Sequence, residues 1–471
     1  MNKTIKGIYA NSKEVRENNS LFVSIKGAKA DGNDFICEAI ENGARIIVCE
    51  ILPEKQNERC LYIKVPDSRK VLASLASEFY STDRTKLKLI GITGTNGKTT
   101  VATQSRRVLE LMWNTKVGFI GTIGFSLSST ETNIPQARTT PEAIEIHRLL
   151  STMSNQGVAG AVLEVSSHAL ELDRVYGMLF DVAVFTNLSQ DHLDFHSSMD
   201  SYFLAKSKLF TMLKEPTGKA VINGDDVYGK CLSAKRMIRY GLDNSNDLTA
   251  EIKHYSIRGT DVIVRWQNER VSLRLPLIGM FNVYNSLASM GVGLSLGGCV
   301  KDVAEGIEQV TSIDGRMQIF CSKNNVYAVI DYAHTPDGLE KAINSIKRIK
   351  QVGSKIITVF GCGGDRDKSK RSVMGNIAST LSDMVVLTAD NSRSEKTEDI
   401  VAEIEKGIHT KKNVRKVLNR EDAIKDALSL AKSNDVVFIA GKGHEMYQEF
   451  DQERIFFDDR EIVKKEFALL C

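Results

Sequence analysis

Short apolar runs of strand length alternate with amphipathic patterns along most of the chain. Over residues 1–83, the strand-like runs LFVSI, RIIVCE and LYIKV are separated by the helical patterns DFICEAIENGA and RKVLASLASEFY. Strands that alternate with amphipathic helices are typical of mixed α/β domains. The pattern therefore predicts a small mixed α/β unit over residues 1–83.

A second unit begins after the polar stretch STDRTKLK. An apolar strand, a glycine turn and a helical pattern follow one another over residues 86–113, and AGAVLEV, DVAVFTNL and KAVIN are further strand-like runs. Apolar residues then fall on every second position over residues 248–278, which predicts an antiparallel hairpin attached to this unit. We expect a central domain with a parallel sheet over residues 84–311.

Strands and helices alternate again from residue 312 to residue 471. The strand-like runs NVYAVID, KIITVFG, MVVLTAD and DVVFIAG are joined by helical patterns and short connections. This alternation predicts a parallel, doubly wound sheet. The expected fold class is therefore α/β with three domains, of which the third is Rossmann-like.

The longest uncharged run, residues 275–300, contains two Asn and several Ser and Gly. It predicts a buried, tightly packed helix, because a membrane span requires about 20 predominantly apolar residues. The first residues, MNKTIKGIYANSKEV, lack an apolar core behind their lysines, so we expect no secretory signal.

Composition adds limits on the partners and the compartment. The chain has 471 residues, with 62 Lys and Arg against 59 Asp and Glu, so its formal charge of +3 does not suggest a general binder of nucleic acid or membrane surfaces. Its eight cysteines are scattered and form no C-x-x-C pair. This usage fits free thiols in a reducing cytosol, so we expect a cytoplasmic protein.

A glycine-rich turn follows the first strand of the central domain and opens a helix. It reads GTNGKTT and consists of Gly94, Thr95, Asn96, Gly97, Lys98, Thr99 and Thr100. Backbone N–H groups in such a turn bind phosphates, while the lysine pairs with the β- and γ-phosphates and the hydroxyl that follows it ligates Mg²⁺. The usual spacing places the first glycine at position 92, where this chain has Ile92. The alternative is a strand-to-helix turn that binds nothing.

Three more features of the central domain have open interpretations. Glu164 ends a predicted strand, where either a second Mg²⁺ contact or a solvated carboxylate is reasonable. The loop over residues 186–196 is either a metal site or a hydrogen-bonded polar loop, and it carries Asp191, His192, Asp194 and His196. Lys206 lies on the helical pattern YFLAKSKLF, and from the pattern alone it is a surface lysine.

Polar clusters follow three predicted strands of the last domain. They are GCGGDRD at residues 361–367, DNSR at 390–393 and GKGHE at 441–445. Because the carboxyl ends of parallel strands meet at one edge of a sheet, we expect these clusters to converge on one crevice. Their mixture of acids and arginines suits a zwitterionic ligand, although each cluster alone could be a solvated loop.

Residues near the junction of the last two domains could reach a bound nucleotide. Asn282 and Asn285 open the uncharged helix, where either a ligand contact or a core amide is reasonable. Arg316, Asp331 and His334 lie just past the domain junction. Side chains there could extend from the third domain to a nucleotide on the second.

Taken together, these motifs resemble those of the Mur ligase family of peptidoglycan synthesis. The resemblance extends from about residue 8 to residue 450, and the motifs occur in the order GTNGKTT, TTPE, EVSSHAL, FTNLSQDHLDFH, YFLAKSKLF, GMFNVYNSLA, DGRMQ, DYAHTPD, GCGGDRDKSKR, DNSR and GKGHE. It implies ATP-dependent amide formation, through an acyl phosphate, between the γ-carboxyl of D-Glu in UDP-MurNAc-L-Ala-D-Glu and an amine of a diamino acid. The expected partners are therefore small-molecule substrates. We expect no nucleic-acid partner, no membrane span and a monomer.

The resemblance also assigns roles to individual residues. It implies ATP contacts for the glycine-rich turn at 94–100 together with Asn282, Arg316 and Asp331. It implies Mg²⁺ contacts for Thr99, Glu164, His192 and Lys206, with Lys98, His192 and Lys206 catalytic and Lys206 carbamylated. A carbamate converts a cation beside Mg²⁺ into an oxygen ligand. The implied contacts of UDP-MurNAc-dipeptide are Ser12, Thr139, Thr140, Ser166 and Arg174, and those of the amino acid are Arg366, Asp390, Asn391, Ser392, Arg393, Gly441 and Glu445.

Some positions depart from the family pattern. The first domain reads Asn11-Ser12-Lys13 where Asp-Ser-Arg is usual, Arg138 stands where Asn is common, and Leu172 occupies a position that is often Gln. Ser392 replaces the proline usual in enzymes that add meso-diaminopimelate, but Arg393 is kept.

A guanidinium at position 393 would bind the distal carboxylate that diaminopimelate has and L-lysine lacks. We therefore expect meso-diaminopimelate as the added amino acid, with L-lysine as the alternative. The two other candidate functions are a folate polyglutamylating ligase and a nucleotide-dependent switch that binds a partner. Folate ligases lack a domain like residues 1–83, and a switch would not need a crevice that binds a zwitterion.

Overall fold

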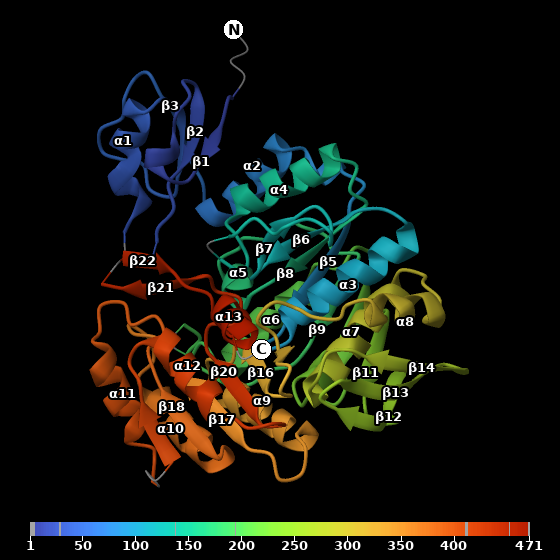
Figure 1. Cartoon of the computed structure of the whole chain (residues 1–471). Helices are drawn as coiled ribbons and strands as arrows, with labels where there is room; N and C mark the ends of the chain where they lie inside the picture. The colour runs from blue at the N-terminus through green and yellow to red at the C-terminus, as the bar shows by residue number, and fades with distance from the viewer. Residues whose placement is uncertain are drawn as a thin grey trace.

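The computed structural model describes residues 5–27, 30–136, 138–193, 195–409, 413–451 and 453–469. Three bodies are seen in Figure 1, each built around its own sheet, and the central body lies beside both the N-terminal and the C-terminal one. The parallel-rich sheets of the three bodies and the helices that flank them confirm the predicted α/β fold class.

The N-terminal body is a parallel sheet with strand order β1-β2-β3-β4. Its strands are β1 (Ile8–Tyr9), β2 (Ser20–Val23), β3 (Ala44–Cys49) and β4 (Leu61–Lys64). Its helical segments are η1 (Ser12–Glu14), η2 (Gly32–Phe35), α1 (Ile36–Glu41), α2 (Ser68–Phe79) and η3 (Thr82–Arg84).

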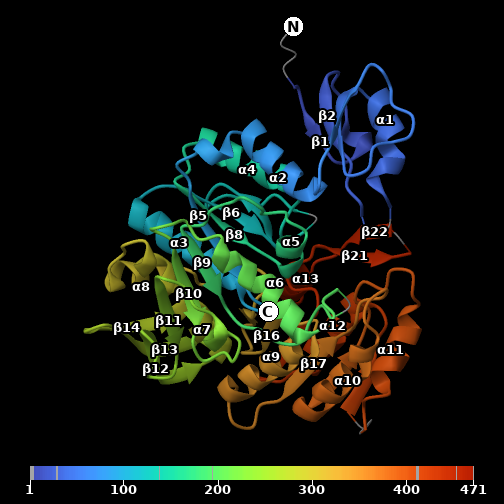
Figure 2. The ribbon, with the colours of Figure 1, turned by 180° about the vertical axis from the view of Figure 1, so that it is seen from behind.

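Helix α2 joins this body to the central one. Leu72 and Leu75 of α2 pack in one apolar cluster with Val48 of β3 and Ile144 of α4 (Ala143–Asn155). Figures 1 and 2 show α2 and α4 side by side above the central sheet. The same helix therefore covers one sheet and rests on the next body.

The central sheet has the strand order β14-β13-β12-β11-β10-β9-β5-β8-β6-β7. Its strands are β5 (Lys88–Thr93), β6 (Val117–Gly121), β7 (Gly124–Ser126), β8 (Gly160–Glu164), β9 (Val182–Phe185), β10 (Lys219–Asn223), β11 (Met237–Gly241), β12 (Leu248–Ser256), β13 (Gly259–Trp266) and β14 (Glu269–Leu275). Along this order the strands from β6 to β12 pair in parallel. Strand β7 pairs antiparallel with β6, and β12, β13 and β14 pair antiparallel with one another. The expected hairpin is thus a three-stranded antiparallel extension that continues the same sheet.

Helices cover both faces of the central sheet. They are α3 (Lys98–Trp113), α4, α5 (Ser167–Glu171), α6 (Met199–Thr211), α7 (Met280–Ser295) and α8 (Val300–Glu308), with the short η4 (Gly229–Cys231). One apolar core joins α3, α7 and α8 to one face, and another joins α4 and α6 to the other.

Helix α7 confirms the prediction of a buried helix in the uncharged run, but it is shorter than that run. Leu275 ends β14 and Val300 begins α8, so the helix occupies only the middle of residues 275–300. None of the helices in the described parts of the chain is both long and apolar enough to cross a membrane.

The C-terminal sheet has the order β15-β16-β20-β17-β18-β19, parallel except for β15. Its strands are β15 (Gln318–Cys321), β16 (Tyr327–Asp331), β17 (Ile356–Phe360), β18 (Met384–Leu387), β19 (Val414–Lys416) and β20 (Val436–Ala440), and a separate hairpin is formed by β21 (Tyr447–Phe450) and β22 (Glu453–Phe456). Its helices are α9 (Pro336–Ile349), α10 (Ser369–Leu381), α11 (Thr397–Glu405), α12 (Arg420–Leu430) and α13 (Asp459–Leu469). Helices α9, α10 and α11 pack on one face and α12 and α13 on the other, which confirms the doubly wound prediction.

Candidate active site

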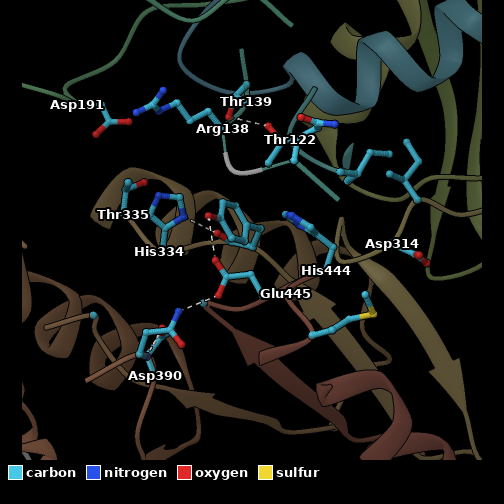
Figure 3. A pocket seen from close by; sticks show the side chains of 18 of the residues that line it. Thr122, Arg138, Thr139, Asp191, Asp314, His334, Thr335, Asp390, His444 and Glu445 are labelled. Carbon is cyan, nitrogen blue, oxygen red and sulfur yellow. Dashed lines mark hydrogen bonds between the residues drawn. The ribbon is translucent and has the colours of Figure 1, made fainter. Parts of the chain in front are cut away.

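A cavity of about 2220 Å³ lies between the central and C-terminal bodies. Residues of the central body, such as Thr122 and Thr139, form one wall, and residues after β17, β18 and β20 form the opposite wall. Figure 3 shows Thr122, Thr139 and Asp191 on one side and Asp390, His444 and Glu445 on the other. Ligands held by the two bodies would therefore meet in this space.

The glycine-rich turn joins β5 to α3 at the edge of the central sheet. Gly94 has φ +147° and Gly97 has φ +89°, both in the region that favours glycine. A Cβ on Gly94 would lie 1.9 Å from Thr186 Oγ1, and one on Gly97 would lie 2.3 Å from Asn285 Oδ1. Glycine is thus required at both positions, and the turn leaves backbone N–H groups at the N-terminus of α3, the arrangement that binds phosphate.

Lys98 and Lys206 both lie against this turn. Lys98 Nζ donates to the carbonyl oxygens of Gly94 and Thr95, each at 2.9 Å, and Lys206 Nζ donates to the carbonyl of Gly94 at 2.9 Å. The Lys206 side chain is only 1% exposed, so the surface interpretation of this lysine is wrong. Burial, reinforced by the nearby Lys98, lowers the pKa of Lys206 well below its usual range. Burial also lowers the pKa of Lys98, against the opposing effect of Glu164.

Glu164, at the carboxyl end of β8, is fully buried, so the solvated interpretation of this carboxylate is wrong. Its oxygens accept hydrogen bonds from Thr122 N at 2.9 Å, Thr122 Oγ1 at 3.0 Å and Thr99 Oγ1 at 3.1 Å. The Thr99 hydroxyl also accepts a hydrogen bond from Arg316 Nη2 at 3.1 Å. A carboxylate and a hydroxyl next to a phosphate-binding turn are oxygen donors of the kind that Mg²⁺ prefers.

The loop over residues 186–196 supports the glycine-rich turn. Thr95 N donates to Asn187 O at 2.8 Å, and Asn96 N donates to Asn187 Oδ1 at 3.0 Å. His192 is about half exposed, with Nε2 3.5 Å from Asp191 Oδ2 and its ring 4.8 Å from that of His168. Within the described ranges, no three His, Cys, Asp or Glu side chains form a group that could hold a metal.

The same loop carries two further residues that the sequence singled out as metal candidates, His196 and Asp194. His196 is buried, and its Nε2 lies 2.9 Å from Ser167 Oγ. Asp194 lies outside the described residues.

Four of the residues expected to bind the dipeptide form one network beside Glu164. Thr140 Oγ1 donates to Glu164 O at 2.8 Å, accepts from Ser166 N at 3.0 Å and lies 3.2 Å from Ser166 Oγ. Arg174 Nη1 donates to Thr140 O at 3.0 Å, and Thr139 Oγ1 lies 3.0 Å from Thr122 Oγ1.

The fifth expected contact, Ser12, lies apart in the N-terminal body. It is buried there, its hydroxyl donates to Glu38, and its carbonyl accepts from Asn42 Nδ2 at 3.0 Å.

The predicted nucleotide residues lie around the turn but in different environments. Asn282 is buried behind it, where its Nδ2 donates to Ile278 O at 2.7 Å and its Oδ1 accepts from Asn285 Nδ2 at 2.9 Å. Arg316 extends from the C-terminal body and stacks on Tyr332, with 4.9 Å from guanidinium to ring centre. Asp331 ends β16 and accepts from Met317 N at 2.7 Å, and burial raises its pKa.

The three C-terminal clusters converge as predicted, because β20, β17 and β18 are neighbours in the sheet and their following loops line the cavity. Asn391 Nδ2 donates to Glu445 Oε2 at 2.9 Å, and Asp390 Oδ1 accepts from Asn391 N at 2.6 Å. Gly441 has φ +112°, and a Cβ there would lie 2.5 Å from Asp390 Oδ2. Close approach of the two loops therefore depends on this glycine.

The remaining residues of these clusters differ in their access to the cavity. Arg366 and Arg393 both line it. Arg393 Nη1 donates to Gly364 O at 2.6 Å, and its Nε lies 3.6 Å from Glu449 Oε2. Ser392 is buried, with its hydroxyl 2.6 Å from Thr397 Oγ1, and it is not among the residues that line the cavity.

Three residues of this site were not among the predicted ligands. Thr122 supplies two of the hydrogen bonds to Glu164, and Lys442 is a buried partner of Asn391 and Glu445. Asp337, at the start of α9, accepts from Asn96 Nδ2 at 3.2 Å and Ser189 Oγ at 3.1 Å and so links the two bodies. The signal for Thr122 was its place directly after a buried strand, since polar residues there lie at the carboxyl edge of the sheet.

Comparison with family models gives matches over most of the chain. Residues 92–293 match the Mur ligase middle domain, and residues 315–443 match the glutamate ligase domain of Mur ligases. Residues 4–80 match the catalytic domain of the Mur ligase family.

Similar proteins match over nearly their whole length. UDP-N-acetylmuramoyl-L-alanyl-D-glutamate–2,6-diaminopimelate ligase 1 of Clostridium acetobutylicum is 44% identical over 99% of this chain and 95% of its own. The ligase of the same name from Clostridium botulinum is 41% identical over 98% of this chain and 95% of its own.

Solved structures agree with this match. A structure titled UDP-N-acetylmuramoyl-L-alanyl-D-glutamate–2,6-diaminopimelate ligase superposes with a TM-score of 0.69 at 30% identity, covering 99% of this chain and 95% of that one. The MurF ligase from Thermotoga maritima in complex with ADP has a TM-score of 0.66 at 22% identity, covering 98% of each chain, and at that identity it supports the fold alone.

Proposed function

Because the chain belongs to the Mur ligase family, we propose that it is an ATP-dependent ligase that joins meso-diaminopimelate to the γ-carboxyl of UDP-N-acetylmuramoyl-L-alanyl-D-glutamate. The reaction makes a peptidoglycan precursor. The observation that carries the proposal is a cavity with three charged loops on one wall and Thr122 on the other. Thr122 donates to Glu164, and Glu164 accepts from Thr99 of the phosphate-binding turn. Acid activation and amine binding can then occur within reach of each other.

The acid substrate is assigned to the wall formed by the central body. Thr139, Thr140, Ser166 and Arg174 offer hydroxyl and guanidinium donors to carboxylate and amide oxygens of the dipeptide. Their network is hydrogen-bonded to the backbone of Glu164, so the γ-carboxylate would lie near the phosphate-binding turn. Ser12 of the N-terminal body is assigned to the uridine nucleotide.

The triphosphate is assigned to the turn at residues 94–100, with Lys98 beside its β- and γ-phosphates and Arg316 approaching from the C-terminal body. Thr99 and Glu164 would hold Mg²⁺, with His192 as a further candidate ligand. When bound, this ion neutralises phosphate charge during phosphoryl transfer.

Lys206 is assigned as a carbamylated lysine. Its amine is buried against Gly94 O with Lys98 beside it, which favours the neutral form. A neutral amine can attack CO₂, forming an N–C bond and releasing one proton, and the product is a carbamate anion. That anion would supply an oxygen ligand beside the phosphate-binding turn in place of a second ammonium group.

The amine substrate is assigned to the wall formed by the C-terminal body. Arg393 and Arg366 would bind carboxylate groups of the diamino acid, and Asp390 and Glu445 would bind ammonium groups. Diaminopimelate carries both kinds of group at its distal end, whereas L-lysine lacks the distal carboxylate. The retained Arg393 is the feature that favours diaminopimelate.

The reaction then follows from the placement of these groups. A γ-carboxylate oxygen attacks the terminal phosphorus of ATP, forming an acyl phosphate and releasing ADP. The free amine attacks the acyl carbon, phosphate departs, and the amine loses a proton. Closure of the two bodies would exclude water, which otherwise hydrolyses the acyl phosphate.

An assay of phosphate release tests this function. The protein is incubated with ATP, Mg²⁺ and UDP-MurNAc-L-Ala-D-Glu, together with meso-diaminopimelate, L-lysine or L-ornithine. Release that depends on diaminopimelate supports the proposal, and preference for L-lysine would revise the amino acid. Hydrolysis of ATP that no amino acid stimulates would favour a nucleotide-dependent switch.

A folate polyglutamylating ligase is the alternative amide ligase. The folylpolyglutamate synthase of Mycobacterium tuberculosis in complex with ADP and AMPPCP has a TM-score of 0.65 at 18% identity, but it covers 79% of this chain. Phosphate release with folate and glutamate in the same assay would favour that alternative.

A further inference from the structure

Lys442 is a buried cation inside the amino-acid side of the cavity wall. It follows β20 and lies between two glycines with positive φ, Gly441 at +112° and Gly443 at +54°. Its side chain is fully buried, and its Nζ lies 5.3 Å from the centre of the Tyr447 ring. A lysine at 0% exposure is unusual unless its ammonium group is paired.

The partners of Lys442 are two residues assigned to the diamino acid. Nζ donates to Asn391 Oδ1 at 3.0 Å and to Glu445 Oε2 at 3.1 Å. Asn391 Oδ1 also accepts from Glu449 N at 3.1 Å. The Lys442 ammonium group and the Glu449 N–H can only donate, so the Asn391 atom that both contact must be the carbonyl oxygen Oδ1. These two donors therefore fix the orientation of the Asn391 amide.

This orientation directs the Asn391 NH₂ group toward Glu445, to which it donates at 2.9 Å. The other carboxylate oxygen of Glu445 lies 3.4 Å from Tyr332 OH. Glu445 Oε2 is therefore occupied by protein donors. Among the described residues, Tyr332 OH at 3.4 Å is the hydrogen-bond partner of Oε1, so Oε1 is the oxygen left for a substrate ammonium group.

We propose that Lys442 is a positioning residue for the incoming diamino acid. Its ammonium group holds the Asn391 amide and the Glu445 carboxylate in the orientation in which they bind the carboxylate and ammonium groups of that substrate. This inference rests on the proposed function, because it assigns Asn391 and Glu445 to the diamino acid. No substrate atom needs to touch Lys442.

Steady-state kinetics of Lys442→Met test the proposal. Methionine keeps the length of the side chain and removes the donors. We expect the KM for diaminopimelate to rise about tenfold or more, as for loss of charge-assisted hydrogen bonds, with the KM values for ATP and UDP-MurNAc-L-Ala-D-Glu within about twofold of wild type. An unchanged KM for diaminopimelate, or an equal rise for all three substrates, would overturn it.

Ile346→Ala is the matched control for lost stability. Ile346 is buried in the apolar core of the same body and is not one of the residues that line the cavity. The control should lower the midpoint of thermal unfolding without moving the KM for diaminopimelate. If it raises that KM as much as Lys442→Met does, the effect belongs to general loosening of the domain and the proposal fails.

A second variant covers the case in which Lys442→Met does not fold. The double variant K442M/E445Q removes both members of the buried ion pair, so no unpaired charge remains. Comparison with E445Q alone isolates the effect of Lys442 on Asn391, and we expect the double variant to have the higher KM for diaminopimelate. Equal KM values would overturn the proposal.

Failure of the proposed function is distinguishable from failure of this inference. The first would appear as wild-type protein without amino-acid-dependent phosphate release. The second would appear as active wild-type protein whose Lys442 variants keep the wild-type KM for diaminopimelate.

Discussion

Lys98 and Lys206 donate hydrogen bonds to one acceptor, the carbonyl oxygen of Gly94, each at 2.9 Å. Two ammonium groups that share one acceptor repel each other, and the burial of Lys206 increases the cost of its charge. The neutral form of Lys206 is therefore favoured. This is the form that can become a carbamate.

Replacement of Lys206 should abolish ligation whether or not the positive charge is kept. We expect Lys206→Ala and Lys206→Arg each to lower kcat at least about a hundredfold, because neither side chain can form a carbamate ligand. Phosphate release measures the loss, and ¹³C NMR with labelled bicarbonate detects the carbamate in wild type. Lys208→Ala is the control, since Lys208 is exposed on the same helix and pairs with Glu171. Full turnover in Lys206→Ala would contradict the metal-ligand role.

Glu164→Gln should weaken both the Mg²⁺ site and the fold. Glu164 now accepts hydrogen bonds from three donors, and the amide nitrogen of glutamine would face at least one of them without being able to accept. One unsatisfied buried group costs about 1–3 kcal/mol of stability. We expect a higher Mg²⁺ concentration for half-maximal phosphate release and a lower midpoint of urea unfolding. Glu251→Gln, at an exposed position of β12, should change neither. A Glu164→Gln protein with an unchanged Mg²⁺ requirement would rule out the ligand assignment.

Arg393→Met should reduce the preference for diaminopimelate over L-lysine. Loss of a guanidinium–carboxylate pair costs about 2–3 kcal/mol, which corresponds to a rise in the KM for diaminopimelate of about 30- to 150-fold. The KM for L-lysine should change by less than about threefold, because lysine has no distal carboxylate. Arg415→Met is the control, since Arg415 pairs with Asp426 on the surface. Parallel loss for both amino acids would mean that Arg393 does not read the distal carboxylate.

His147 should make the stability of the protein depend on pH. Burial lowers the pKa of His147 to about 4, and its Nδ1 lies 2.6 Å from Thr82 Oγ1. The folded pKa is below the unfolded value of about 6.5, so the unfolded state binds more protons and stability falls as pH drops from about 6.5 to about 4. Between pH 8 and pH 5 this group should cost about 2 kcal/mol.

Urea unfolding of wild type and His147→Asn at both pH values checks this prediction. The asparagine variant should lose about 2 kcal/mol less than wild type over the same change, since asparagine does not titrate. His254→Asn, at an exposed position of β12, is the control and should behave as wild type. Equal losses for wild type and His147→Asn would show that this histidine does not titrate on unfolding.

Much of the fold and one half of the site follow from local patterns. Buried strands followed by polar residues were sufficient to place the clusters at 361–367, 390–393 and 441–445 on one crevice, because parallel strands align their carboxyl ends. The extent of the antiparallel extension was less clear, since a period of two does not reveal how many strands pair or which sheet they join.

The other half of the site depends on contacts between distant segments. Glu164 is held by Thr122 and Thr99, which no local pattern connects to it. Lys206 did have a local signal, because Tyr202, Ala205 and Leu209 place it on the buried face of α6 at helical spacing. A lysine on such a face is easily taken for a surface residue until its partner, here Gly94 O, is known.

The cavity is bounded by two bodies whose sheets share no strand, and Asp337 contacts Asn96 and Ser189 across the divide. A small molecule that occupies only one wall can be lost whenever the bodies separate. An inhibitor that tethers a mimic of the activated acid to a diamino-acid moiety would engage both walls, and each half would raise the local concentration of the other. Linker length would set that local concentration, and with it the gain in affinity over either half alone.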